Sequence, residues 1–307
     1  MAGADQFQAN RDLRANPAPS ERGAEVPFRT KREILRRVEE LGSTQPWNHN
    51  FLLPFGVQTR PSIANSERHG KSTGKWKWLR PYLESLDLSG KRVLDVGCNE
   101  GFFSLRCREL GAREVVGIDI NPQRIEKAHF IIDLLQPSAV QFVQRDLFGP
   151  DLPEIGRFDV AICLGVLHRV PNPYGALRII SALADQVVVE WRAFHDRKGQ
   201  SLLWYRRLVN ESDPDNTSYF FPTVTWVEEV LHEQGLTCSF SDDVSPWNRA
   251  VVIASRSDAP LFHRGNVRRR TSVVNELRAR CIGRFRCVRQ FLTGRAAARN
   301  NKSTPVN

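Results

Sequence analysis

The sequence predicts an α/β fold in which a largely parallel β-sheet is covered by helices on both faces. Between residues 91 and 192, short apolar segments alternate with helical patterns at the rhythm of repeated βα units. These apolar segments are nearly continuous, which is typical of strands buried on both faces. The 307-residue chain is 41% hydrophobic and 25% charged, a composition that supports a packed core and excludes a globally disordered protein.

Seven strands and six helices are expected in this fold. The strands fall at residues 91–97, 114–120, 139–144, 158–164, 186–191, 236–241 and 249–255. The helices fall at residues 31–41, 76–86, 101–111, 122–135, 173–184 and 223–234. Pro81 interrupts the second helix, and Gly235 ends the last one.

Composition divides the chain into four regions. Residues 1–30 are polar and rich in Pro and Ala, so we expect a flexible arm. Residues 31–90 are expected to form a helical and irregular cap, and residues 91–256 the sheet domain. Residues 257–307 form a basic tail, in which apolar residues of segment 273–292 recur at three- and four-residue steps and predict an amphipathic helix.

The positive charge of the protein is concentrated in this tail. Residues 264–302 contain twelve Lys or Arg and one acidic residue, whereas the other 32 basic and 33 acidic residues nearly cancel. Such a tail suits RNA phosphates or anionic lipid headgroups. The alternatives are a tail that docks on the protein's own body and a poorly ordered appendage.

Cysteine spacing and apolar run lengths argue against two classes of protein. The six cysteines form no C-x-x-C pair and no Cys/His cluster, so we expect reduced thiols and no metal site. No run approaches the ~18 apolar residues of a membrane span, and the N-terminal segment lacks a secretory apolar region. We therefore expect a cytoplasmic protein, located at the inner membrane surface only if the tail binds lipid.

The most informative segment is VLDVGCNEGFFS at residues 93–104. An apolar strand contains Asp95, Gly97 opens a tight turn, and Gly101 starts a helix. This arrangement lets backbone N–H groups and the positive end of the helix approach a polar ligand. The next strand ends at Asp119, 22 residues after Gly97, where an acidic side chain reaches the ribose hydroxyls of a bound nucleoside.

Two nucleoside ligands compete for this loop. A dinucleotide fingerprint needs glycine at positions 97, 99 and 102, but the chain has Gly97, Asn99 and Phe102. Asp95 would also repel a pyrophosphate. The pattern D-x-G-x-x-x-G, followed by Asp119, suits a ligand that carries an amine and a sulfonium, such as S-adenosylmethionine. Glycines that only turn the chain would explain neither acidic residue.

Residues after the second, third and fourth strands complete the expected cofactor site. Ile120 follows Asp119 directly. Asp146, next to Leu147, would accept a hydrogen bond from the exocyclic amine of an adenine; the alternative is a solvated loop acid. Leu164 ends the fourth strand, and ligands of open α/β sheets lie at the carboxyl ends of the strands.

Segments 93–104, 114–120 and 158–175 resemble class I S-adenosylmethionine-dependent methyltransferases. Within that superfamily the chain resembles the tRNA wobble-uridine methyltransferase and carboxymethyltransferase group. The shared features are WKW at 76–78, GKRVLDVGC, GIDI, FDVAICLGVLH and FFPTVTWVEEVLHEQGL. The resemblance covers roughly residues 45–255. It implies a Rossmann-like sheet of seven strands, the last one antiparallel.

The resemblance also implies roles for individual residues. Lys77 matches a lysine that binds the carboxylate on the modified cofactor of the carboxymethyl enzymes; the alternative is a surface lysine between two packed tryptophans. Gly97 and Asp119 match loop and ribose contacts, and Leu164 matches a residue of the adenosyl pocket. Arg249 matches a C-terminal arginine of the family and is expected to contact the substrate. Residues 193–221 fall where such enzymes place acceptor-specifying elements, or else form a hydrophobic lid.

Two departures from the family favour plain methyl transfer over carboxymethyl transfer. His168 stands where the carboxymethyl enzymes have a tyrosine, and Ser72 where they have a tryptophan. An unperturbed imidazole titrates near ~6.5, so His168 is the expected base for an acceptor that must lose a proton. The alternative is packing against Arg169 and Pro171. His49 is expected to line the acceptor side, with a packing role as its alternative.

Three functions of the protein remain open, and the first two differ in the methyl acceptor. The resemblance implies an RNA methyltransferase that acts on a tRNA wobble uridine, although the body outside the tail is nearly neutral. The second is a methyltransferase for a small molecule, a glycan or a lipid-linked saccharide. The third is a non-catalytic nucleoside-binding adaptor, which an intact loop with Asp95 and Asp119 argues against.

Overall fold

The computed structural model of the protein describes residues 30–63, 72–194, 196, 199–208, 217–242 and 249–256. The expected arm at residues 1–30 falls outside these residues except for Thr30. The basic tail at 257–307, with the amphipathic helix expected at 273–292, also lies outside the described residues.

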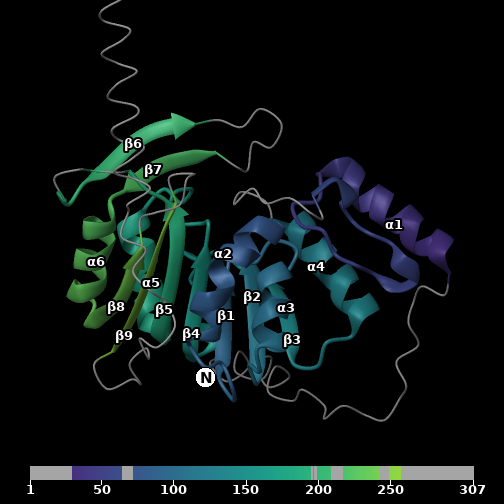
Figure 1. The fold of residues 1–307 in the computed structure, drawn as a ribbon, viewed down its shortest axis with the longest axis horizontal. Helices are drawn as coiled ribbons and strands as arrows, with labels where there is room; N and C mark the ends of the chain where they lie inside the picture. Colours follow the sequence, from purple (N-terminus) through teal and green to yellow (C-terminus); the bar gives the residue numbers. More distant parts are fainter. Residues whose placement is uncertain are drawn as a thin grey trace, which may run out of the picture.

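A seven-stranded sheet forms the centre of the protein, as the sequence predicted (Figure 1). Its strand order is β3-β2-β1-β4-β5-β9-β8, in which β9 runs antiparallel to both of its neighbours. The strands are β1 (Arg92–Val96), β2 (Glu114–Asp119), β3 (Val140–Gln144), β4 (Phe158–Leu164), β5 (Ala184–Arg192), β8 (Leu236–Asp242) and β9 (Arg249–Arg256). The chain order reverses between β1 and β4, which creates a crevice at the carboxyl ends of these two strands.

Helices cover both faces of the sheet because successive strand residues point to opposite sides. In β1, Val93 belongs to the apolar core beneath α2 (Ser72–Glu84) and α3 (Phe102–Glu109). Leu94 belongs to the opposite core, beneath α5 (Pro173–Leu183) and α6 (Val224–Glu233). Polar caps fix the helix starts: the side chain of Asn172, for example, accepts a hydrogen bond from the N–H of Gly175.

The N-terminal part of the described chain packs on the same face as α3 and α4 (Pro122–Leu135). Helix α1 (Lys31–Thr44) begins with a capping box between Thr30 and Glu33, and it buries Ile34, Val38 and Leu41. An irregular strap, residues 45–63, then crosses the carboxyl edge of the sheet and contains the short helices η1 (Pro54–Gly56) and η2 (Pro61–Ile63). The indole N–H of Trp47 ties this strap to α1 through the carbonyl of Val38 at 2.9 Å.

Two strands that the sequence did not predict, at residues 203–208 and 218–222, form a separate ribbon. It pairs β6 (Leu203–Leu208) with β7 (Ser218–Pro222) and lies above the carboxyl ends of β4 and β5 (Figure 1). Trp204 packs on Phe221, with ring centroids 5.6 Å apart. None of the helices in the described part of the chain has the length and apolar character needed to cross a bilayer.

Candidate functional site

A cavity of about 440 Å³ opens at the crevice between β1 and β4. Its walls come from the ends of β1, β2 and β4, from the strap at 45–63, from α2 and from the first residue of β9. Ten of the residues predicted from sequence line it: His49, Asp95, Gly97, Asn99, Asp119, Ile120, Asp146, Leu147, Leu164 and Arg249. The structure therefore brings these residues together, and their binding roles stay predictions.

Close packing around the glycine loop explains its residue types. Gly97 has φ +69°, and a Cβ there would lie 2.3 Å from Cγ2 of Val166. Gly101 has φ +81° and forms the N-cap of α3, where a Cβ would lie 2.1 Å from Cζ of Phe142. Only glycine fits either position without displacing its neighbour. Gly101 shapes the loop from behind and does not line the cavity.

Two carboxylates at the strand ends are held in different ways. Asp95 is buried and accepts a hydrogen bond from Oγ of Ser104 at 2.6 Å. Burial raises the pKa of Asp95 to about 6, although the hydrogen bond from Ser104 opposes the shift. Asp119 accepts hydrogen bonds from the backbone N–H groups of Asn99 at 3.0 Å and Asn121 at 2.9 Å. Asp119 thereby connects the loop after β1 to the loop after β2.

Asp146, the third carboxylate predicted to contact the cofactor, lies in the loop after β3. It is exposed on the surface of its loop, lines the cavity, and accepts the backbone N–H of Phe148 at 2.9 Å. The carboxylate therefore faces the cavity from a turn that its own side chain stabilises.

A buried charge cluster forms the opposite wall of the cavity. Glu190 of β5 is 0% exposed and pairs with Nζ of Lys75 at 2.7 Å and Nη1 of Arg249 at 2.8 Å. Burial favours the neutral acid, yet Arg249 and Lys75 together hold the pKa of Glu190 below its ordinary value. Burial and the nearby charge of Arg249 lower the pKa of Arg169 to about 10. The cluster therefore carries more positive than negative charge.

The structure places Lys77 outside the cavity that the prediction assigned to it. Lys77 is exposed and does not line the cavity, whereas Lys75 does and pairs with Glu190. Residues two apart on a helix point in nearly opposite directions, because each residue turns the helix by about 100°. Lys75 precedes the fully buried Leu79 by four residues, so helical spacing in the sequence held the signal that identifies the inward lysine.

The structure places His168, the predicted base, behind the cavity wall and not on it. His168 is 0% exposed and absent from the cavity wall. Its Nδ1 accepts the backbone N–H of Arg192 at 3.2 Å, and its carbonyl oxygen accepts the N–H groups of Tyr219 and Phe220. Burial and the surrounding arginines lower the pKa of His168 well below its ordinary value, so the ring is neutral. His168 joins the loop after β4 to β5 and β7.

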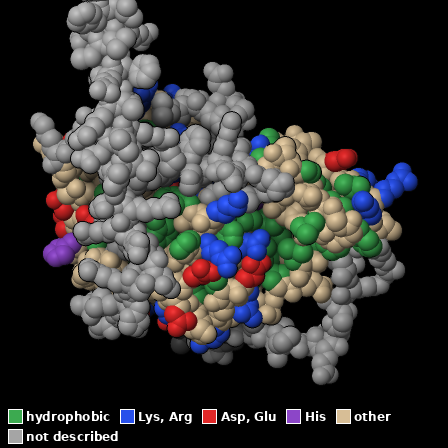
Figure 2. All heavy atoms as spheres, in the orientation of Figure 1, with side chains coloured by type: hydrophobic (Ala, Val, Ile, Leu, Met, Phe, Trp, Pro, Cys, Tyr) green, Lys and Arg blue, Asp and Glu red, His purple; other side chains and the backbone are tan. Residues whose placement is uncertain are grey.

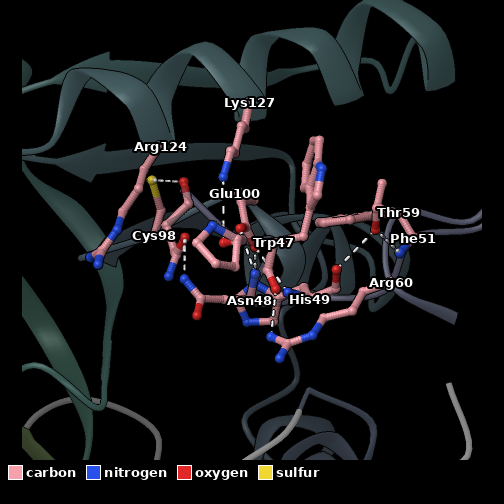
Figure 3. A network of polar contacts seen from close by, with 12 residues as sticks. Trp47, Asn48, His49, Phe51, Thr59, Arg60, Cys98, Glu100, Arg124 and Lys127 are labelled. Atoms are coloured by element: carbon pink, nitrogen blue, oxygen red, sulfur yellow. Dashed lines mark hydrogen bonds and ion pairs between the residues drawn. The ribbon is translucent and has the colours of Figure 1, made fainter. Parts of the chain in front are cut away.

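The sequence analysis assigned no role to Lys75 and Glu190 of the charge cluster, nor to Glu100 in the glycine loop. Glu100, at 0% exposure, accepts the backbone N–H groups of Asn48 at 2.7 Å and His49 at 3.0 Å. It also contacts Nδ1 of His49 at 2.7 Å (Figure 3). Lys127 of α4 holds the preceding turn by donating to the carbonyls of Gln45 and Pro46. No spacing rule in the sequence links position 100 to a strap about fifty residues earlier.

The described residues contain no group of three or more His, Cys, Asp or Glu placed to hold a metal ion. The side chains that line the cavity include the carboxylates of Asp95, Asp119 and Asp146 and several cations. An open, parallel-stranded sheet with an acidic glycine loop at its switch point defines a nucleoside-binding α/β domain.

The comparisons with known proteins narrow this class. Residues 87–189 match the family model described as a methyltransferase domain. The tRNA U34 carboxymethyltransferase of Campylobacter hominis is 34% identical over 154 residues, which cover 49% of this chain and 49% of that protein. The enzyme of the same name from Pseudomonas aeruginosa is 32% identical over 211 residues, covering 67% of this chain and 61% of that protein. The chain spans about half the length of the first of these relatives.

A solved structure supports the same fold. The N-terminal domain of EvdMO1 with SAH bound superposes with a TM-score of 0.58 and 20% identity, covering 75% of this chain and 98% of that domain. The fold is that of class I S-adenosylmethionine-dependent methyltransferases, and the resemblance stated from sequence is confirmed.

Proposed function

We propose that the protein is an S-adenosylmethionine-dependent methyltransferase whose acceptor is a uridine of tRNA. The observation that supports this most is the placement of Asp95, Gly97 and Asp119 around one cavity, within the segment that matches the methyltransferase domain. The named relatives that modify tRNA support the choice of acceptor.

The chemistry of the cavity fits the proposed cofactor. S-adenosylmethionine carries an ammonium, a sulfonium and ribose hydroxyls, which suit the carboxylates of Asp95 and Asp119. Its adenine has an exocyclic amine that can donate a hydrogen bond to the carboxylate of Asp146. The N–H groups of Gly97 and Cys98 both donate to the carbonyl of Ile118, at 2.8 and 2.9 Å, so the loop is fixed in place at the cavity wall. When bound, the cofactor supplies an activated methyl group, so the protein mainly binds, orients and excludes water.

Plain S-adenosylmethionine suits the cavity better than its carboxylated form. Lys77, the lysine that the resemblance assigned to the added carboxylate, lies outside the cavity. His168, at the position of the family's tyrosine, is buried and does not line the cavity either. The cations that do reach this wall, Lys75 and Arg249, are already paired with Glu190.

A small molecule or glycan is the second candidate acceptor. It is favoured by the near-neutral balance of 32 basic and 33 acidic residues outside segment 264–302. Figure 2 shows Lys and Arg side chains beside Asp and Glu side chains on the face that carries α2 and α3. On the helices themselves, Arg80 pairs with Glu84 in α2 and Arg106 pairs with Glu109 in α3. An RNA enzyme usually displays a basic face instead.

Transfer of a labelled methyl group tests the proposal. The full chain is incubated with labelled S-adenosylmethionine and, in parallel, with tRNA and with glycan, lipid and small-molecule extracts. Asp119→Ala is the blank, and calorimetry with S-adenosylhomocysteine measures cofactor binding separately. Label in tRNA supports the proposed acceptor, and label in another fraction supports the second candidate. Cofactor binding without any transfer would favour a non-catalytic adaptor, and no cofactor binding would refute the methyltransferase.

A further inference from the structure

The imidazole of His49 lies in the cavity wall and is held by packing. Its ring stacks on Phe102, with centroids 5.2 Å apart and an interplanar angle of 7°. The side chain is 13% exposed and is part of the cavity wall. His49 is the only histidine among the described residues that line the cavity.

A buried carboxylate lies against one nitrogen of this ring. Oε2 of Glu100 lies 2.7 Å from Nδ1 of His49 and also accepts the backbone N–H of His49 (Figure 3). A carboxylate at this distance favours a proton on Nδ1, which leaves Nε2 with its lone pair. Within the described part of the chain, no hydrogen bond to Nε2 of His49 is recorded.

Among the other side chains of the cavity, Asp119 accepts two backbone N–H groups and Asp146 accepts that of Phe148. Lys75 and Arg249 are cations paired with Glu190, and Asp95 is hydrogen-bonded to Ser104 away from solvent. His49 with Glu100 instead has the arrangement of a general base whose orientation is set by a second, buried group.

We propose that His49 is the general base of the methyl transfer and that Glu100 is its positioning residue. The inference rests on the proposed methyltransferase function and specifies its acceptor as a group that must lose a proton, such as a hydroxyl. As the hydroxyl oxygen bonds to the methyl carbon, the carbon–sulfur bond breaks and its electron pair stays on sulfur. The hydroxyl proton moves to Nε2 of His49, and the resulting imidazolium is balanced by Glu100 until the proton passes to water.

The first test is independent of turnover. Nitrogen-15 NMR of the histidine-labelled full chain reports which ring nitrogen carries the proton, and the His49 signals are assigned by their loss in His49→Gln. For the neutral ring the expected result is a proton on Nδ1 and none on Nε2, with less of this tautomer in Glu100→Gln. A neutral wild-type ring with its proton on Nε2 would overturn the proposal.

The second test measures methyl transfer into the acceptor fraction that the wild type labels. His49→Gln is expected to lower the rate at saturating acceptor by about 10²–10⁴-fold, the range of general-base contributions. Its affinity for S-adenosylhomocysteine should stay within about threefold, because the backbone of the strap keeps its bonds to Glu100. Added imidazole is expected to restore part of the rate of His49→Ala. The matched control is His129→Gln, an exposed histidine on α4 outside the cavity.

The outcomes separate this inference from the proposed function. If the wild type transfers methyl and His49→Gln transfers it at the same rate, the base assignment is wrong and the methyltransferase stands. If the wild type binds no S-adenosylhomocysteine, the proposed function is refuted and the transfer step with it.

Discussion

Removal of the charge of Glu190 is expected to be one of the most damaging single changes at the cavity. Its carboxylate is fully buried between Lys75 and Arg249, whose side chains are 13% and 10% exposed. Glu190→Gln keeps the volume but leaves two poorly solvated cations without their counter-charge. Breaking a buried ion pair in this way costs about 3–5 kcal/mol of unfolding free energy.

Urea unfolding of the full chain at pH 7 measures this cost. The matched control is Glu84→Gln, which breaks an i,i+4 pair with Arg80 whose side chains are 59% and 41% exposed and should cost below about 0.5 kcal/mol. The double variant Glu190→Gln with Lys75→Met should recover part of the loss, since one uncompensated cation is removed. A loss below about 1 kcal/mol in Glu190→Gln would refute the view that this pair is buried and essential.

The pH dependence of the same protein gives an independent check. The pKa of Glu190 is lower in the folded protein than in the unfolded chain. Its contribution is therefore fully present above the unfolded pKa, near ~4.3, and is lost as the pH falls through the lower folded pKa. Glu190→Gln should remove this part of the acid sensitivity.

Three further predictions concern the loop and the buried histidine. Gly101→Ala would place a Cβ 2.1 Å from Phe142 and should cost about 1–3 kcal/mol, measured as a lower melting temperature; an unchanged temperature would contradict the packing argument. The pKa of Asp95 is about 6 when folded and 3.8 as a free side chain, so the folded protein keeps a proton that the unfolded chain releases. Stability should therefore fall by up to about 3 kcal/mol as pH rises from 4 to 6, and a series of urea titrations should show no such slope for Asp95→Asn. His168→Ala should lower the unfolding free energy by about 1–3 kcal/mol, because the N–H of Arg192 loses its buried acceptor. If His168→Ala keeps its unfolding free energy but loses methyl transfer, the result would instead support His168 as the base.

Local pattern was sufficient to predict most of the sheet. Each parallel strand is a short apolar run followed by a polar or glycine turn, and this information lies within about ten residues. The cofactor loop was predictable for the same reason, because Asp95, Gly97 and Gly101 fall within one strand–turn–helix unit. The β6–β7 ribbon escaped prediction because its two strands are joined across the chain segment 209–217 and have no strong alternation of their own.

The roles of individual polar side chains depend on where each side chain points in the folded protein, and a sequence motif does not give that direction. The motif at residues 76–78 led to the prediction of Lys77, but the helical turn of α2 directs Lys75 toward the cavity. His168 lies in a segment expected to face the cofactor, yet the ribbon and the end of β5 cover it from outside. Both differences arise from packing between segments that are far apart in the chain.

The sequence by itself determined the α/β class, the strand that carries the glycine loop, and the acidic residues at the first two strand ends. These features follow from local apolar periodicity and from the conformations that only glycine adopts readily. The tertiary structure alone decided that Glu100 meets His49, that Glu190 joins Lys75 to Arg249, and that His168 is enclosed. The physical reason is that a buried charge or imidazole takes its properties from whichever partners and solvent the fold brings within a few ångströms, and those partners lie about 24 to 115 residues away along the chain.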